Sequence, residues 1–142
     1  MARPKLEPRA TSGGSYFTSA KTSLSFINSG ATLLDCVLGG GWPLGRVVNV
    51  VGDKATGKTL VAIEACANFS QQYANGKIWY DEIESAFDKS YAAALGMPLD
   101  RVKFIEGHES VEDLFEKLDR LLEAKEKKGD TSPGLFIVDS LD

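Results

Sequence analysis

Eight consecutive residues, from Gly52 to Thr59, have the types and spacing of a phosphate-binding loop. They read Gly-Asp-Lys-Ala-Thr-Gly-Lys-Thr and fit the P-loop pattern G-x-x-x-x-G-K-[ST]. Glycines allow the tight turn and let backbone N–H groups come close to an anion. In this pattern Lys58 reaches the outer phosphates of a nucleoside triphosphate and the Thr59 hydroxyl ligates Mg²⁺. The predicted nucleotide-binding residues are Gly52, Asp53, Lys54, Ala55, Thr56, Gly57, Lys58, Thr59 and Leu60.

The segments on either side of this loop predict the elements that position it. Residues 46–51 are rich in β-branched side chains, which favours a buried strand. Residues 60–69 predict a helix, whose N-terminus would add its N–H groups to the phosphate site. A chance glycine turn is the alternative, and the order strand, glycine loop, helix argues against it.

Carboxylates follow two other predicted strands. Four apolar residues precede Asp139, which predicts a buried strand whose carboxylate emerges at the carboxyl edge of a sheet and holds Mg²⁺, directly or through water. Acidic residues also follow a strand predicted over residues 77–81, where a carboxylate can polarise the attacking water of a hydrolysis reaction. Glu84 is our choice for this role, and Glu82 is the next candidate. A solvated acidic turn is the alternative interpretation. Lys58 is the other predicted catalytic residue.

The remaining elements give the fold class. A short helix near residues 32–38, capped by Ser29 or Thr32, should end at the glycines 39–41. Apolar residues at helical spacing after Ser110 predict a helix with a core-facing stripe. Strands that alternate with helices predict an α/β fold in which helices flank a parallel sheet. The expected strands span residues 77–81, 102–105 and 135–139, and the expected helices include residues 90–95 and a segment ended by Gly129.

Composition sets the broad limits. The 142 residues are 43% hydrophobic and 25% charged, which is ordinary for a single globular domain. A net charge of −4 gives no general attraction to nucleic acid. Without an apolar stretch of membrane-spanning length or a secretory signal, a cytoplasmic protein with no membrane partner is expected. Cys36 and Cys66 lack metal-binding spacing and are expected to be two buried free thiols.

Several of these segments resemble the RecA recombinase family. Residues 29–35 and 38–48 resemble that family's approach to the P-loop, residues 82–96 its segment after the second strand, and residues 137–140 its Walker B strand. The resemblance implies a P-loop NTPase of RecA type that uses ATP and Mg²⁺. It also implies a DNA-dependent ATPase of homologous recombination and DNA repair, which binds single-stranded DNA and assembles into a filament or ring in the complete protein.

The resemblance also implies roles for individual residues. Glu84 lies where the family has its catalytic glutamate, Tyr91 where a tyrosine stacks on adenine, and Asp88 where an aspartate lies near the adenine amino group. Stacking of an aromatic ring on a base is physically reasonable. The P-loop interior, residues 53–56, departs from the family's more usual Pro-Glu-Ser-Ser.

The family's DNA-binding loops and its γ-phosphate sensor lie beyond Asp139. The chain is therefore expected to be the N-terminal part of a RecA-like core, incomplete at its C-terminus. Within it, residues 1–21 are expected to form a mobile basic arm and residues 22–142 the ATPase core. The arm has no clear amphipathic helix of the kind that family members dock on their neighbours.

Other classes of protein share parts of this pattern. One is a different motor of the RecA fold, such as a DnaB-type helicase or a KaiC-type ATPase. Another is a nucleotide-binding module without turnover of its own, and a P-loop small-molecule kinase is more distant. Residues 82–96 favour the recombinase. ATP turnover measured with and without single-stranded DNA would separate the recombinase, the other RecA-fold motor and the module without turnover.

Overall fold

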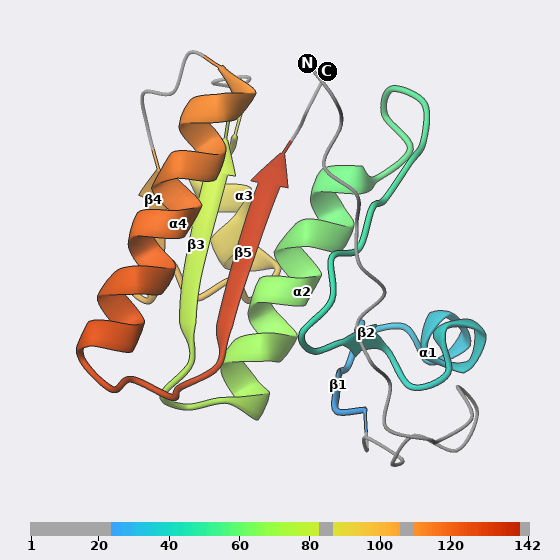
Figure 1. Cartoon of the computed structure of the whole chain (residues 1–142). Helices are drawn as coiled ribbons and strands as arrows, with labels where there is room; N and C mark the ends of the chain where they lie inside the picture. Colours follow the sequence, from blue (N-terminus) through green and yellow to red (C-terminus); the bar gives the residue numbers. More distant parts are fainter. Residues whose placement is uncertain (1–23, 83–86, 106–109, 140–142) are drawn as a thin grey trace, which may run out of the picture.

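The computed structural model describes residues 24–82, 87–105 and 110–139 of the chain. Within these ranges helices and strands alternate along most of the sequence (Figure 1). In chain order the elements are β1 (Phe26–Ile27), α1 (Thr32–Leu38), β2 (Trp42–Pro43), α2 (Lys58–Gln72), β3 (Lys77–Glu82), α3 (Lys89–Ala94), β4 (Val102–Ile105), α4 (Val111–Lys127) and β5 (Gly134–Asp139).

The main sheet is parallel and has the strand order β4-β3-β5. Ile78 of the central strand lies opposite Val102 on one side and Leu135 on the other. The middle of β3 is buried, because it has a strand on each side and helices over both faces. This confirms the predicted parallel α/β sheet and the strands expected near residues 77–81, 102–105 and 135–139.

Helices cover the two faces of this sheet (Figure 1). On one face, Ile78 and Tyr80 of β3 pack in a buried cluster with Ile63 and Phe69 of α2. On the other face lies α4, and Trp79 contributes with this helix to a shallow hollow. Consecutive residues of a strand point to opposite faces, so β3 supplies side chains to both layers.

A small antiparallel ribbon packs against α2. Ile27 of β1 lies opposite Trp42 of β2, and Ile27 belongs to the same buried cluster as the main sheet. The Gln72 side chain donates a hydrogen bond of 2.8 Å to the Phe26 carbonyl, which ties the ribbon to the end of α2. The turn into β2 requires glycine at Gly41, where φ is +112° and a Cβ would lie 2.2 Å from the Ile27 oxygen.

Residues 46–51 do not form the predicted buried strand. Val47 is 99% exposed and Val51 is 86% exposed, and the segment pairs with no described strand. β-Branched residues favour an extended backbone, but a buried strand also needs a hydrogen-bonded neighbour and cover on its faces. Among the described strands, β5 has a neighbour on one side only, and this segment does not occupy the other side. The P-loop is therefore reached through an exposed connection.

Two expectations about α1 are also wrong. The helix begins after Ala31, so neither Ser29 nor Thr32 is its cap, and no side chain caps it. The Ser29 hydroxyl instead bonds locally, to the backbone N–H and carbonyl of Ala31, each at 3.2 Å. Cys36 is exposed, because α1 buries none of its residues, whereas Cys66 is buried as expected.

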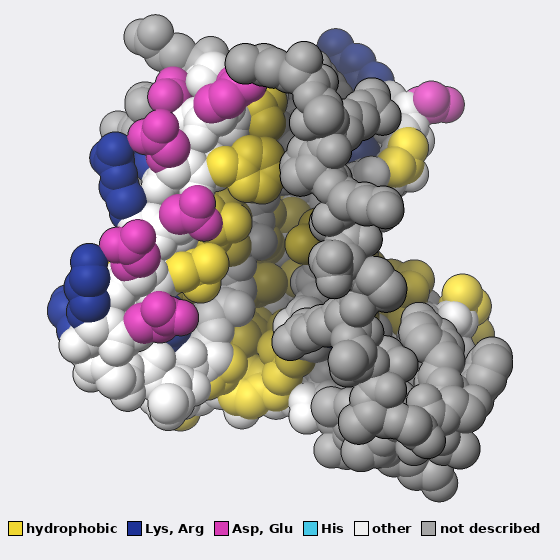
Figure 2. All heavy atoms as spheres, in the orientation of Figure 1, with side chains coloured by type: hydrophobic (Ala, Val, Ile, Leu, Met, Phe, Trp, Pro, Cys, Tyr) yellow, Lys and Arg dark blue, Asp and Glu magenta, His cyan; other side chains and the backbone are white. Residues whose placement is uncertain are grey.

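The stripe on α4 is less buried than the helical spacing predicted. Leu114 is buried, but Phe115 is 60% exposed and Leu122 is 51% exposed. Helical spacing shows which residues share a face, but it does not show how wide a surface that face will meet. Figure 2 shows an apolar strip beside the acidic side chains of this helix.

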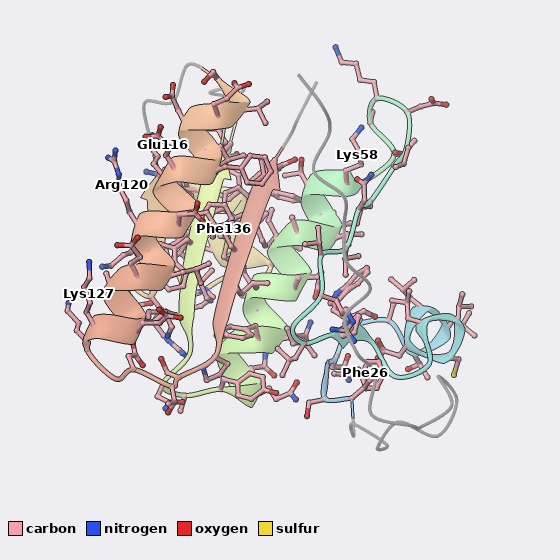
Figure 3. The ribbon with its side chains drawn as sticks, viewed as in Figure 1. Phe26, Lys58, Glu116, Arg120, Lys127 and Phe136 are labelled. Carbon is pink, nitrogen blue, oxygen red and sulfur yellow. The ribbon has the colours of Figure 1, made fainter. Side chains whose placement is uncertain are left out.

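The start of α4 at Ser110 and its end just before Gly129 match their predicted signals. The Ser110 hydroxyl accepts a hydrogen bond of 3.2 Å from the Asp113 N–H, which is the expected N-cap. Its polar face carries ion pairs one turn apart, Arg120 with Glu116 at 3.1 Å and Lys127 with Glu123 at 3.0 Å (Figure 3). Such exposed pairs contribute little to stability, so α4 is held mainly by its apolar contacts.

Asp130 connects the start of β3 to the loop before β5. Its carboxylate pairs with the Lys77 ammonium, accepts hydrogen bonds from Ser132, and lies 3.3 Å from the Lys125 ammonium. The hydrogen bond from Lys77, followed by those from Ser132, holds the pKa of the Asp130 carboxyl well below its usual range. This cluster holds the amino ends of two neighbouring strands together. Within the described ranges, no helix combines the length and apolar character needed to cross a bilayer.

Candidate nucleotide site

The predicted P-loop leads directly into α2, which starts at Lys58 and confirms the helix expected there. Gly57 is the N-cap residue, with φ +94°, and no side chain caps the helix. The first N–H groups of a helix have no partner within the helix, so they need a side chain, water or a ligand. Because α2 has 15 residues and a glycine cap without a side chain, its N-terminus suits an anion such as phosphate.

Lys58 folds back over the loop that precedes it. Its ammonium donates hydrogen bonds to the carbonyl oxygens of Gly52, at 2.8 Å, and Asp53, at 3.1 Å. Figure 3 shows Lys58 at the amino end of α2, level with the carboxyl end of β5. An incoming phosphate would offer this ammonium a charged acceptor in place of two neutral ones, and charge-assisted bonds are about twice as strong.

The loop has a compact internal structure. The Thr56 hydroxyl donates a hydrogen bond of 2.7 Å to the Asp53 carbonyl, and Ala55 has a left-handed φ of +61°. A Cβ built on Gly52 would lie only 2.6 Å from the Thr56 hydroxyl oxygen, so the glycine allows the chain to fold closely on itself. The other predicted loop residues, Lys54 and Thr59 together with Leu60 of the first turn, are exposed to solvent.

The carboxyl edge of the sheet brings two acidic residues together. Asp139 is the last residue of β5, and Glu82, the last residue of β3, lies directly opposite it in the parallel register. The Glu82 carboxylate accepts a hydrogen bond of 3.3 Å from the Phe87 N–H. Because α2 packs against β5, this edge lies on the side of the sheet that carries the loop. The predicted position of Asp139 at a strand end is therefore confirmed, but β5 is half-buried and not the buried strand that the apolar run predicted.

Tyr80 is a member of this site that the sequence did not reveal. Its hydroxyl donates a hydrogen bond of 2.7 Å to Asp139 Oδ2, and its side chain is fully buried. Burial, followed by the hydrogen bond to Asp139 and that residue's charge, raises the pKa of Tyr80, so the hydroxyl remains a donor. A tyrosine within a predicted buried strand signals a need for a hydrogen-bond partner, but the sequence does not show which strand lies beside it.

The donor set fits a magnesium ion that arrives with a nucleotide. Among the described residues, no group of three His, Cys, Asp or Glu side chains could hold a metal ion. Mg²⁺ usually keeps several waters and binds through one or two carboxylates together with phosphate oxygens. The Asp139 carboxylate and the Thr59 hydroxyl are hard oxygen ligands of this kind.

The predicted adenine contacts lie around α3. Asp88 is its N-cap, and one carboxylate oxygen accepts hydrogen bonds from the N–H groups of Ser90, at 2.8 Å, and Tyr91, at 3.0 Å. Asp88 thus also has a structural role, as the cap of α3. Tyr91 is 54% exposed, so its ring is accessible to a base, and stacking on adenine stays a prediction. Glu84, the predicted catalytic carboxylate, lies outside the described residues.

Comparisons with known proteins agree with the sequence resemblance. A model of the RecA N-terminal domain matches residues 14–141. The chain is 40% identical over 96 residues to protein RecA of Nostoc punctiforme, an alignment that covers 68% of this chain and 26% of that protein. It is 36% identical over 103 residues to protein RecA of Crocosphaera subtropica, which covers 72% of this chain and 29% of that protein. It is 33% identical over 122 residues to protein RecA of a Picosynechococcus species, which covers 86% of this chain and 32% of that protein.

The matches cover most of this chain but only part of its relatives. The chain aligns with about a quarter to a third of the length of these curated relatives. The matching domain, by contrast, covers nearly all of this chain. The chain belongs to the RecA family.

Proposed function

We propose that this chain supplies the nucleotide-binding part of a RecA-type, DNA-dependent ATPase that acts in homologous recombination and DNA repair. The observation that carries the proposal is the amino end of α2, where a glycine cap leaves helix N–H groups without a side-chain partner beside Lys58. This arrangement supports a phosphate site in a RecA-type P-loop NTPase core, because the N–H groups and the ammonium offer donors and positive charge to the same anion.

In the proposed site, residues of the P-loop and residues at the carboxyl edge of the sheet have different roles. Lys58 and the backbone of residues 52–59 bind the phosphates, while Thr59 and Asp139 hold Mg²⁺. When bound, the metal ion neutralises charge on the phosphate oxygens. Glu84 orients the attacking water as general base, and Glu82 is the alternative, which its position opposite Asp139 supports.

The remaining assignments follow from the family. Tyr91 stacks on the adenine ring and Asp88 lies near its amino group. Single-stranded DNA is the proposed partner, and self-assembly into a filament or ring is proposed for the complete protein, in the cytoplasm. Residues 1–21 are proposed as an arm and residues 22–142 as part of the ATPase core.

Removal of the Lys58 ammonium tests the nucleotide site. Lys58→Ala should weaken binding of Mg·ATP by about 10- to 100-fold, which corresponds to roughly 1.5–3 kcal/mol for a hydrogen bond to a charged group. Lys54→Ala is the matched control, since the proposal uses only the backbone of Lys54 and the substitution removes the same charge from an exposed side chain in the same loop. Calorimetric titration of the folded proteins measures both affinities. Equal affinities for the wild type and Lys58→Ala would exclude the loop as a phosphate site.

Turnover requires a separate test. Glu84→Gln should leave ATP affinity nearly unchanged and lower the rate of phosphate release by a factor on the order of 10²–10⁴, because a general base acts in the transition state. Glu82→Gln is the paired variant, and each is assayed in the complete protein, with and without single-stranded DNA, because the family's DNA-binding loops lie beyond Asp139. Full activity in Glu84→Gln with a loss in Glu82→Gln would move the catalytic role to Glu82.

A further inference from the structure

The Tyr80 hydroxyl lies at the tip of a side chain that has little freedom to move. The residue is fully buried in the central strand, and its ring packs against Phe87, with centroids 4.9 Å apart, and Phe104, with centroids 5.8 Å apart. A buried hydroxyl needs a hydrogen-bond partner, and here that partner is Asp139 Oδ2 at 2.7 Å. The donor is therefore fixed in space by packing before any ligand binds.

The strand register explains why this hydroxyl meets that carboxylate. Tyr80 lies opposite Ile137, and Asp139 follows two residues later on the same face of β5. The hydrogen bond thus runs diagonally across the two strands, toward the carboxyl edge of the sheet. Long side chains can reach such a diagonal neighbour. Asp139 is held from within the sheet by Tyr80, with Glu82 opposite it at the edge.

The hydrogen bond restricts how the carboxylate can turn. Rotation of a carboxylate about its last torsion is broad and roughly two-fold, so an unheld Asp139 would present either oxygen over a range of angles. Tyr80 engages Oδ2 and leaves Oδ1 as the other oxygen of the group. Mg²⁺ demands near-ideal octahedral geometry, so the orientation of a ligating carboxylate affects metal affinity strongly.

We propose that Tyr80 is a positioning residue, which orients the Asp139 carboxylate so that Oδ1 meets the Mg²⁺ of a bound nucleotide. This inference rests on the proposed nucleotide site and adds a residue that acts through Asp139 without touching the ligand. Tyr80→Phe keeps the ring and its packing and removes only the donor. It therefore tests orientation with little disturbance of the core.

The experiment measures ADP affinity by calorimetry, once with Mg²⁺ and once with a chelator. In Tyr80→Phe, ADP affinity measured with Mg²⁺ should fall by about tenfold, whereas ADP affinity measured with the chelator should not change. A tenfold loss is at the low end of what is usual when a residue that is hydrogen-bonded to a metal ligand is removed. Tyr73→Phe is the matched control, because it removes a hydroxyl that accepts a hydrogen bond from Gln72 at the far end of α2. In an Asp139→Asn background, Tyr80→Phe should have no further effect.

A second measurement follows the wild-type chain by absorption spectroscopy and compares it with a variant. Addition of Mg²⁺ to the ADP complex should perturb the near-ultraviolet absorption of the buried tyrosine, since its acceptor Asp139 then shares its charge with the metal ion. The perturbation should be absent in Tyr80→Phe, and an unchanged perturbation in that variant would contradict the role of Tyr80.

The outcomes separate the inference from the proposed function. If the wild type binds ADP and Tyr80→Phe keeps the full gain from Mg²⁺, the positioning role is wrong and the nucleotide site stands. If Tyr80→Phe loses ADP affinity equally with Mg²⁺ and with the chelator, Tyr80 has a purely structural role and the positioning role is wrong. A wild type that does not bind ADP under either condition would overturn the nucleotide site itself.

Discussion

Substitution of the first glycine of the P-loop gives a prediction whose size follows from one contact. The backbone of Gly52 has no left-handed φ, so alanine is allowed there by conformation. Its Cβ would lie 2.6 Å from the Thr56 hydroxyl oxygen, closer than such atoms approach. The Thr56 side chain must rotate, and its 2.7 Å hydrogen bond to the Asp53 carbonyl is lost.

The expected magnitude is that of one neutral hydrogen bond. Such a bond contributes about 0.5–1.5 kcal/mol, so Gly52→Ala should weaken Mg·ATP binding about two- to tenfold by loosening the closed loop. The free energy of unfolding should change little, because the loop is exposed and replacement of glycine by alanine restricts the unfolded chain. Calorimetry gives the affinity, and a urea titration gives the stability.

A double-mutant cycle identifies the cause. Thr56→Ala removes the hydroxyl, so Gly52→Ala should add no further loss of affinity in that background. If Gly52→Ala instead lowers Mg·ATP affinity equally in the wild type and in Thr56→Ala, the loss does not arise from a clash with Thr56. The glycine would then be required by the ligand itself, through close approach of the backbone to phosphate.

Three further predictions concern other parts of the chain. Tyr91→Ala should weaken ATP and ADP binding alike by roughly 1–3 kcal/mol and leave tripolyphosphate binding unchanged; an equal loss for tripolyphosphate would refute stacking on adenine. In the native chain a thiol reagent should modify Cys36 quickly and Cys66 only after unfolding, because burial raises the pKa of the Cys66 thiol to about 12. Because the pKa of Asp130 is lowered by folding, its contribution to stability is present above about pH 4 and is lost as the pH falls through the lower folded value. Urea midpoints at pH 7 and pH 3 should therefore differ less in Asp130→Asn than in the wild type.

The elements that the sequence predicted well are those whose signals are local. The start of α4 follows from the Ser110 cap, and β4 from four residues between turns. The start of α2 follows from the P-loop pattern, since the loop residues and the helix are contiguous. The end of β5 at Asp139 follows from an apolar run that stops at a charge. In each case the information lies within a few residues of the feature.

The predictions that failed required knowledge of distant partners. Residues 46–51 have the composition of a buried strand, but pairing decides whether a strand forms. Cys36 is exposed because α1 buries none of its residues, which its own apolar residues do not reveal. The bond between Tyr80 and Asp139 joins residues 59 positions apart, so it depends on strand order and register. Asp88 caps α3 through a local signal, an aspartate directly before the helix, and it is also the residue to which the resemblance gives a contact with adenine.

The buried cluster that the two sheets share has a consequence for how the chain unfolds. Ile27 of the small ribbon and Tyr80 of the main sheet belong to one buried cluster, so loss of either sheet exposes apolar surface of the other. A domain with one core usually unfolds in one cooperative step. Trp42 lies in the ribbon and Trp79 in the central strand, so their fluorescence should report the same transition. A nucleotide that binds at the proposed site should therefore stabilise that whole cooperative unit and move both signals together.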